Sequence, residues 1–239
     1  GQDAREGETQ ARSDSMILCT YNKASRQLTM TSFLRDLYVP IPGHGSNRIN
    51  AAYAFGGAPL LKKTLETNFG IHLDGCIEVD FDRFADIVDL LDGVPIELRR
   101  DEARVINRET GSTLEEGLQT LNGAQALAYS RIRKIDGDYS RTNRQKTVLK
   151  AIFERCKTMD AAKLAKLVDT VLPMIKTDMT DGDITRYLLE LAPLLPQLEL
   201  RTQTIPEKGT YTHQSIRGMS VVVTDFQVCR DILEDTIGG

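Results

Sequence analysis

The sequence predicts an α/β protein: a single domain over residues 1–239, with a central mixed β-sheet flanked by helices on both faces. Two observations predict this fold class. Apolar runs rich in β-formers alternate with segments of helical periodicity along the chain. Apolar residues make up 41% of the 239 residues, which is enough to bury a full core, and no repeat or shift in composition marks a second domain.

The first half of the chain predicts an alternation of strands and helices. The β-rich runs "SMILCTYN" and "RQLTMTSF" are separated by the short polar segment "KAS", which is typical of a hairpin. The proline- and glycine-rich stretch "PIPGHGSNRIN" indicates a loop. The elements expected next, from apolar spacing and glycine stops, are a helix over 58–69, a buried strand over 76–81, a helix over 84–93 and a strand over 94–98.

The second half predicts mostly helices. Asn122 followed three residues later by Gln125 resembles a capping pair, which places a helix start at this point. The elements expected from apolar periodicity are helices over 122–131, 140–157, 160–171 and 183–192, strands over 198–205 and 219–224, and a closing helix over 226–237.

Composition excludes several classes of function. The formal net charge of −4 argues against a broad basic face that coats nucleic acid or anionic membrane. No P-loop motif is present, and no apolar run approaches the roughly 20 residues that span a bilayer. The wide spacing of the cysteines excludes an ordinary zinc site and leaves both disulfides and packed thiols open; they are Cys19, Cys76, Cys156 and Cys229.

Positive charge gathers between residues 121 and 156 of this acidic chain. On a helix that begins near Ser140, Arg141 and Gln145 fall on the side that becomes apolar further along, so we expect them to point toward the interior. Arg144 and Lys146 are expected on the solvated face. A buried arginine needs an anion, and two sources stay open: carboxylates such as Asp136 and Asp138, or a bound phosphate that guanidinium groups grip with paired hydrogen bonds.

Five sequence blocks, in this order and spacing, resemble the extracytoplasmic domain of the LytR-CpsA-Psr family. The likeness is strongest over about residues 1–157. The blocks are "ARSDSMILCTYN", "TSFLRDLYV", "NRINAAYAFGG", "EVDFDRFADIVDLLDGV" and "LNGAQALAYSRIRKIDGDYSRTNRQ".

The resemblance implies a phosphotransferase. Such an enzyme moves a glycopolymer from a polyprenyl-pyrophosphate carrier onto a hydroxyl of peptidoglycan or a related wall polysaccharide, and forms a phosphodiester. By motif position, it implies that five side chains bind the pyrophosphate: Arg35, Arg131, Arg133, Arg141 and Gln145. It also implies work at the outer face of the cell membrane, with a single-pass anchor upstream of these residues. The low isoelectric point and the lack of a helix-turn-helix or zinc pattern predict no nucleic-acid partner.

The resemblance further implies that Asp3 and Asp14 hold Mg²⁺, a cation that is commonly bound by one or two carboxylates together with substrate phosphates. The predicted catalytic residues are Arg35, Arg133 and Asp14, because phosphoryl transfer relies mainly on positioning and on neutralising charged oxygens. The general base stays open among Asp14, Asp36 and Asp138.

The lipid carrier of this family occupies an apolar channel, and we expect Leu61, Leu65, Phe84 and Val88 to line it, with ordinary core packing as the alternative. Two alternatives to transfer also stay open. One is hydrolysis of the polyprenyl pyrophosphate by water, and the other is a non-catalytic module that binds the prenyl-linked glycan.

Overall fold

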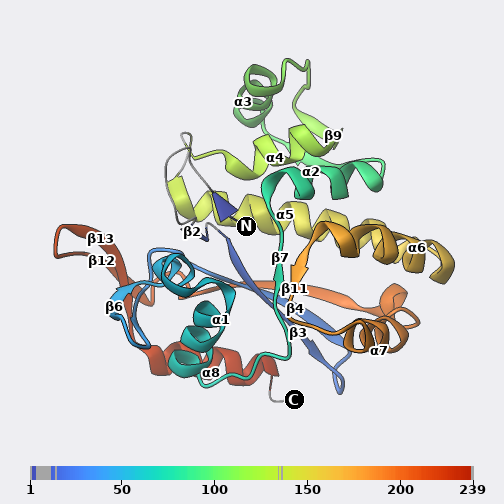
Figure 1. Ribbon diagram of the computed structural model, residues 1–239. Coiled ribbons are helices and arrows are strands. Elements are labelled where there is room, and N and C mark those ends of the chain that lie inside the picture. Colours follow the sequence, from blue (N-terminus) through green and yellow to red (C-terminus); the bar gives the residue numbers. More distant parts are fainter. Residues whose placement is uncertain (1, 4–11, 14, 134, 136, 238–239) are drawn as a thin grey trace. The chain divides into compact units, whose positions relative to one another are not determined.

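The computed structural model describes residues 2–3, 12–13, 15–133, 135 and 137–237 (Figure 1). These residues form two compact units, each built from more than one stretch of the chain. The first unit, called the sheet unit here, comprises residues up to 78, 177–179 and from 197 onward; the second, called the helical unit, comprises 79–176 and 180–196. No composition change signals this division in the sequence.

A three-stranded mixed sheet organises the sheet unit. Strand β4 (Gln27–Phe33) lies in the centre, antiparallel to β3 (Met16–Asn22) and parallel to β11 (Glu199–Ile205). The predicted hairpin is confirmed, and the Asn22 side chain accepts the N–H groups of Ala24 and Ser25 in its turn. The α/β class with a mixed sheet is therefore confirmed.

Helices α1 (Asn50–Phe69) and α8 (Phe226–Ile237) complete the core of the sheet unit. Phe69 of α1 packs on Phe33 with 5.0 Å between ring centroids, and on Phe226 with 6.0 Å. Helix α1 starts eight residues before the predicted helix and kinks at Gly56 and Gly57, so the sequence signal found only its straight second part.

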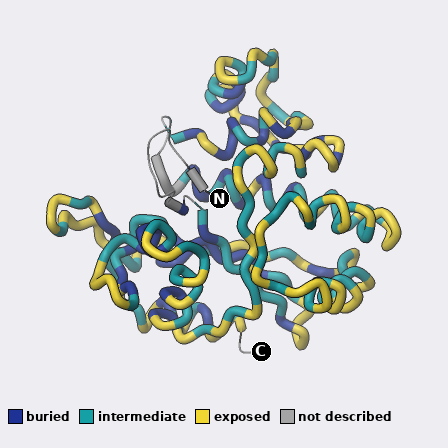
Figure 2. Tube along the Cα trace, viewed as in Figure 1, coloured by how far each residue is buried: buried dark blue, intermediate teal, exposed yellow. Residues whose placement is uncertain are grey.

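Two hairpins depart from the sequence expectations. The stretch over 40–50 was expected as a loop, but β5 (Tyr38–Ile41) and β6 (Gly45–Arg48) pair antiparallel around it. The glycines that indicated a loop supply the turn, as Gly43 has a φ of +79°. Strand β13 (Met219–Thr224) confirms its prediction, whereas its partner β12 (Tyr211–Ile216) escaped prediction because its polar residues are largely exposed (Figure 2).

The helical unit is built around a buried apolar cluster that includes Val88, Ile96, Ile106 and Val148. Sequence periodicity missed two of its elements, the charge-rich helix α3 and the short strand β9. Its principal elements are α2 (Phe81–Leu90), β8 (Val94–Leu98), α3 (Arg100–Thr110), β9 (Gly117–Leu121), α4 (Gly123–Arg131), α5 (Gly137–Lys157), α6 (Ala161–Val171) and α7 (Asp181–Leu191). Strands β8 and β9 pair antiparallel.

The strand predicted over 76–81 is present only in part, and its predicted burial is wrong. Only β7 (Ile77–Glu78) is extended there, and Ile77 is 55% exposed. Asp80 caps α2 instead, because its side chain accepts the N–H of Arg83 at 2.8 Å. The remaining short elements are β1 (Gln2–Asp3), β2 (Arg12–Ser13), β10 (Lys176–Thr177) and the 3₁₀ turns Leu172–Met174 and Leu195–Gln197.

All four cysteines are free thiols, which favours the thiol alternative. Cys229 is fully buried, as expected for a packed thiol, whereas Cys19 is exposed. Among the described residues, none of the helices combines the length and the apolar character needed to cross a bilayer.

Candidate functional site

Arg35 lies just after the carboxyl end of β4, the central strand of the sheet, which is where ligands gather in α/β proteins. Three hydrogen bonds fix the backbone here. The N–H of Leu34 donates to Ile205 at 2.9 Å, the carbonyl of Arg35 accepts from Asn50 at 3.3 Å, and the carbonyl of Asp36 accepts from Val222 at 2.9 Å. Three backbone hydrogen bonds to other parts of the chain therefore fix the position of the segment that carries Arg35.

One carboxylate serves two arginines at this position. Nε of Arg35 lies 3.6 Å from Oδ2 of Asp36, and a terminal nitrogen of Arg48 lies 3.3 Å from Oδ1 of the same residue. All three side chains keep about a quarter of their surface exposed. The ion pair between Arg35 and Asp36 is thus present, but the three groups together carry one more positive than negative charge.

A second group of cations lies in the helical unit, where the capped helix α4 leads into Arg131 and Arg133. The capping box is confirmed, because the Asn122 side chain accepts the N–H of Gln125 and the Gln125 side chain accepts that of Asn122. The next residue, Gly123, packs so closely on α2 that a Cβ there would collide with the carbonyl oxygen of Ala85. Cap and glycine together fix where α4 starts.

Arg144 on α5 joins this segment to the rest of the unit. The side chain is 3% exposed, and its Nε donates to Oε1 of Glu102 at 2.7 Å. A terminal nitrogen donates to the carbonyl of Ile132 at 3.1 Å, between Arg131 and Arg133. The structure therefore brings Arg144 of α5 close to the backbone between Arg131, the last residue of α4, and Arg133. We call these three residues the α4–α5 arginine cluster.

Helix α5 buries more charge than the sequence analysis expected. Arg141 is buried, as predicted, and Gln145 is half-buried. The solvated face assigned to Arg144 and Lys146 is wrong, since both are buried. Apolar periodicity misled this assignment because the start of α5 packs polar groups inward on more than one side. Burial also lowers the pKa of Lys146.

Glu102 is the important residue that sequence reasoning missed. It is 4% exposed and accepts from Arg144 through one oxygen, while its other oxygen accepts the backbone N–H of Arg99 at 3.0 Å and caps α3. A carboxylate three residues after a helix N-cap is a usable sequence signal. Its pairing with a cation 42 residues away is not visible in the sequence.

The predicted magnesium ligands lie near the chain start. Asp3 belongs to β1, which pairs antiparallel with β2, and β2 ends at Ser13, one residue before Asp14. Asp14 itself lies outside the described residues. Within the part of the chain that the structure describes, no three metal-binding side chains form a cluster.

The residues proposed for a lipid channel differ in burial. Val88 is fully buried in the apolar cluster of the helical unit, and Phe84 packs against that cluster. Leu65 on α1 is buried and Leu61 is half-buried. For Val88 the structure favours the core alternative, and the channel role of the four residues stays a prediction.

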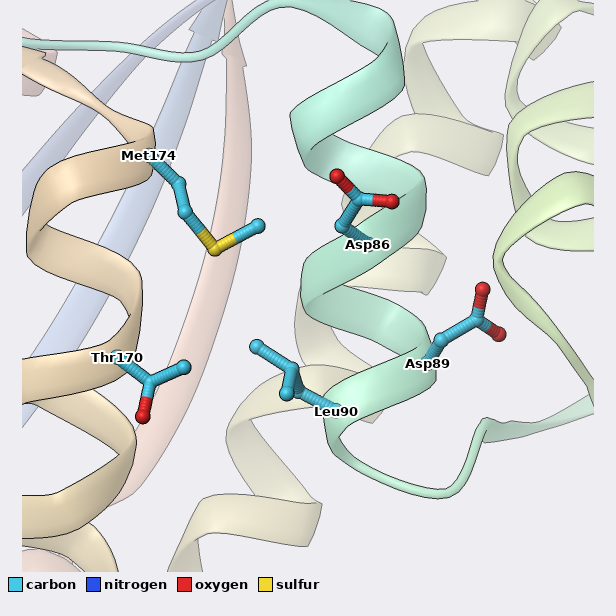
Figure 3. Close-up of a pocket in the computed structure, with 5 residues that line it drawn as sticks. All are labelled: Asp86, Asp89, Leu90, Thr170 and Met174. Carbon is cyan, nitrogen blue, oxygen red and sulfur yellow. The ribbon is translucent and has the colours of Figure 1, made fainter.

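An open pocket of about 450 Å³ is lined by α2 residues other than Phe84 and Val88 (Figure 3). Leu90, 45% exposed, and Met174 form its apolar wall, and Thr170 lies beside them. Two carboxylates complete the lining: Asp86, which pairs with Arg83, and Asp89, which accepts the N–H of Gly123. The α2 residues that line this pocket therefore differ from Phe84 and Val88, the α2 residues that the sequence analysis selected for a lipid channel.

Fold and site together define an α/β protein that presents two groups of arginines suited to a phosphate-bearing ligand. The chain belongs to the LytR_cpsA_psr family, whose model matches residues 1–233.

Two curated relatives place the chain within this family. It is 39% identical over 191 residues to polyisoprenyl-teichoic acid–peptidoglycan teichoic acid transferase TagT of Bacillus subtilis, covering 77% of this chain and 59% of that protein. It is 31% identical over 244 residues to the regulatory protein MsrR of Staphylococcus aureus, covering 98% of this chain and 73% of MsrR. The chain thus spans less than two thirds of TagT.

Solved structures of TagT resemble the fold. TagT bound to LIIa-WTA superposes with a TM-score of 0.81 at 32% identity, covering 97% of this chain and 88% of that structure. TagT, also called YwtF, with bound octaprenyl pyrophosphate lipid gives a TM-score of 0.75 at 29% identity, covering 96% and 86%.

Proposed function

We propose that this protein is a phosphotransferase that moves a glycopolymer from a polyprenyl-pyrophosphate carrier onto a hydroxyl of peptidoglycan or a related wall polysaccharide. One observation carries the proposal: this chain, which is 39% identical over 191 residues to a named teichoic acid transferase, has four arginines and one glutamine at the motif positions assigned to pyrophosphate. The name of TagT and the lipid bound in its structure support the donor and acceptor classes.

In the proposed reaction, an acceptor hydroxyl oxygen attacks the phosphorus that carries the glycan. The bond from that phosphorus to the bridging oxygen breaks, and polyprenyl phosphate leaves. Arg35 and the α4–α5 arginine cluster neutralise the non-bridging oxygens and the leaving phosphate, where negative charge develops. That Arg35 and this cluster face one common ligand stays a prediction.

The proton of the attacking hydroxyl needs an acceptor. Asp36 is the candidate with a described side chain, and it lies beside Arg35 and Arg48. Asp14 and the side chain of Asp138 lie outside the described part, so all three stay candidates.

Magnesium dependence belongs to the proposal, with Asp3 and Asp14 as ligands. The pairing of β1 with β2 supports it, because it brings the two segments that carry these carboxylates together. Bound Mg²⁺ would supply positive charge to the phosphate oxygens. Calorimetric titration with Mg²⁺ tests the site without turnover: Asp3→Asn and Asp14→Asn should each weaken binding, and unchanged binding in both would remove the metal from the proposal.

The reaction is tested by product analysis with a polyprenyl-pyrophosphate-linked saccharide, with and without a wall-glycan acceptor. Transfer predicts a new phosphodiester that appears only when acceptor is present. Release of free phospho-glycan at the same rate without acceptor would instead establish the hydrolase.

Arg35→Ala separates an enzyme from a binding module. Loss of an electrostatic stabiliser of the transition state should lower kcat about 100-fold or more while the lipid still binds. Arg186→Ala, which removes an exposed ion pair with Asp183 on α7, serves as the matched control and should leave turnover unchanged. Unchanged turnover in Arg35→Ala would contradict the assigned role.

An outward-facing, membrane-anchored location is also proposed, in keeping with the cell-wall role of the relatives. Protease treatment of intact cells that express the full-length protein tests it. Digestion of this domain without lysis is expected, and protection until lysis would contradict the proposed location.

A further inference from the structure

A pocket of about 230 Å³ lies in the sheet unit, beside the first turns of α1. Asn47 and Arg48 of β6 and Met219 of β13 line it together with Asn50 and Phe55 of α1. Its lining differs in chemistry from the two arginine groups described above, because it contains two side-chain amides and an aromatic ring.

Asn50 is the first sign that this pocket takes a ligand. The residue is 4% exposed and lines the pocket, and its amide is not one of the fully buried side-chain groups that lack a partner, so the amide is open to the pocket. A side-chain amide supplies an acceptor oxygen and two N–H donors. An amide that is both buried and part of the pocket wall therefore has both a donor and an acceptor to offer to a guest.

Phe55 is the second sign. Its ring is 41% exposed and lines the same pocket. The ring stacks on His44 of the β5–β6 turn, with 4.8 Å between centroids and an interplanar angle of 15°, so the phenyl plane is held in place. A fixed, exposed aromatic face beside a buried amide suits a ligand with one apolar face and a polar rim.

A pyranose ring has this character. Its axial C–H groups form an apolar face that packs on an aromatic ring, and its hydroxyl and acetamido groups pair with amide side chains. A bare phosphate would gain nothing from the phenyl ring, and the cation in the wall, Arg48, already pairs with Asp36 at 3.3 Å.

The pocket is linked to the backbone that carries Arg35. The N–H of Asn50 donates to the carbonyl of Arg35 at 3.3 Å, and the N–H of Ile49 donates to Leu37 at 2.7 Å. A sugar seated against Asn50 would therefore lie beside the segment that is proposed to hold the phosphate.

We infer that the pocket of Asn50 and Phe55 is a saccharide subsite that holds one pyranose ring of a substrate glycan, with Asn50 hydrogen-bonding its polar groups and Phe55 stacking on its apolar face. The assignment of that ring to donor or acceptor rests on the proposed transferase function. The ability of the pocket to bind a sugar ring does not rest on that function.

Saturation-transfer NMR with a soluble wall-type disaccharide tests the subsite without turnover. Phe55→Ala should weaken binding roughly 3- to 10-fold, as expected for the loss of one aromatic stacking contact, and Phe55→Tyr should restore it. Leu118→Ala, at an exposed leucine of the helical unit, is the matched control and should bind like the unchanged protein. Thermal melting of each variant confirms folding.

Kinetics then assign the ring. A raised KM for the wall acceptor with kcat and donor KM unchanged identifies an acceptor sugar, and a raised donor KM identifies the first sugar of the carrier-linked glycan. Equal disaccharide binding in Phe55→Ala and Leu118→Ala, or no binding by the unchanged protein, would overturn the subsite. Phe55-dependent binding without any transfer would leave the subsite in place and defeat the proposed function instead.

Discussion

The two arginine groups of this protein differ in how their positive charges are paired and in how far they are buried. Around Arg35, one partly exposed carboxylate is shared by two arginines, and the backbone rather than the ion pair provides rigidity. In the α4–α5 arginine cluster, Arg144 is buried and matched to a buried Glu102. The first arrangement leaves charge available to a ligand, whereas the second uses charge to shape the loop that carries Arg131 and Arg133.

The largest expected effect comes from breaking the buried pair. Arg144→Met leaves the buried Glu102 with only Arg99, a half-exposed cation 3.7 Å away. Loss of the closer, buried cation should lower the free energy of unfolding by about 3 kcal/mol in urea denaturation. Arg104→Ala, an exposed cation on α3, is the control and should change it by less than about 0.5 kcal/mol.

The double variant Glu102→Leu with Arg144→Met sharpens this result. Removing both charges should recover most of the loss, except for about 1 kcal/mol from the missing cap on α3. A double variant as unstable as the single one would show that shape rather than charge holds this region.

A smaller effect is expected at the start of α4. Asn122→Ala removes the side-chain acceptor of the capping box and should cost about 1 kcal/mol of unfolding free energy, measured in the same denaturation series. Asn122→Asp should retain most of the stability, because a carboxylate accepts the same N–H. A loss of 3 kcal/mol or more would mean that the residue does more than cap.

The shared carboxylate near Arg35 should matter little for stability. Asp36→Asn weakens two partly exposed ion pairs, and such pairs contribute about 0–1 kcal/mol each. Equal stability losses in Asp36→Asn and Arg144→Met would abolish the contrast between the two groups.

The smallest effect concerns pH. Burial lowers the pKa of Lys146 below its ordinary value of 10.5, so the unfolded chain binds this proton more tightly than the folded one. The unfolding free energy should therefore rise with pH between the folded-state pKa and 10.5. Lys146→Met should flatten this part of the stability profile, and an unchanged slope would contradict the assignment.

Local signals predicted most of the fold. The first hairpin, the capping box at Asn122 and the closing helix each follow from a pattern within one short, continuous stretch of the chain. The errors occur where tertiary packing decides the outcome. Ile77 belongs to an apolar run yet is exposed, and Arg144 lies among polar residues yet is buried, because its partner Glu102 is distant in sequence.

The candidate site was likewise predicted only in part. Motif likeness identified Arg35, whose place after the central strand is confirmed, but it says nothing of Asn50 or Phe55 as a pair. That an amide and an exposed ring line one pocket becomes visible only when the surrounding atoms are in place.

The third strand of the sheet comes from late in the chain, because β11 pairs parallel with β4. Helix α8 of the same unit lies later still. A fragment cut near residue 157, where the family motifs end, would retain every charged residue assigned to pyrophosphate but would leave β4 with one bare edge. Such a fragment should aggregate rather than fold. Any shortened version made for assays or crystals must therefore keep the last 43 residues, from Gln197 to Gly239.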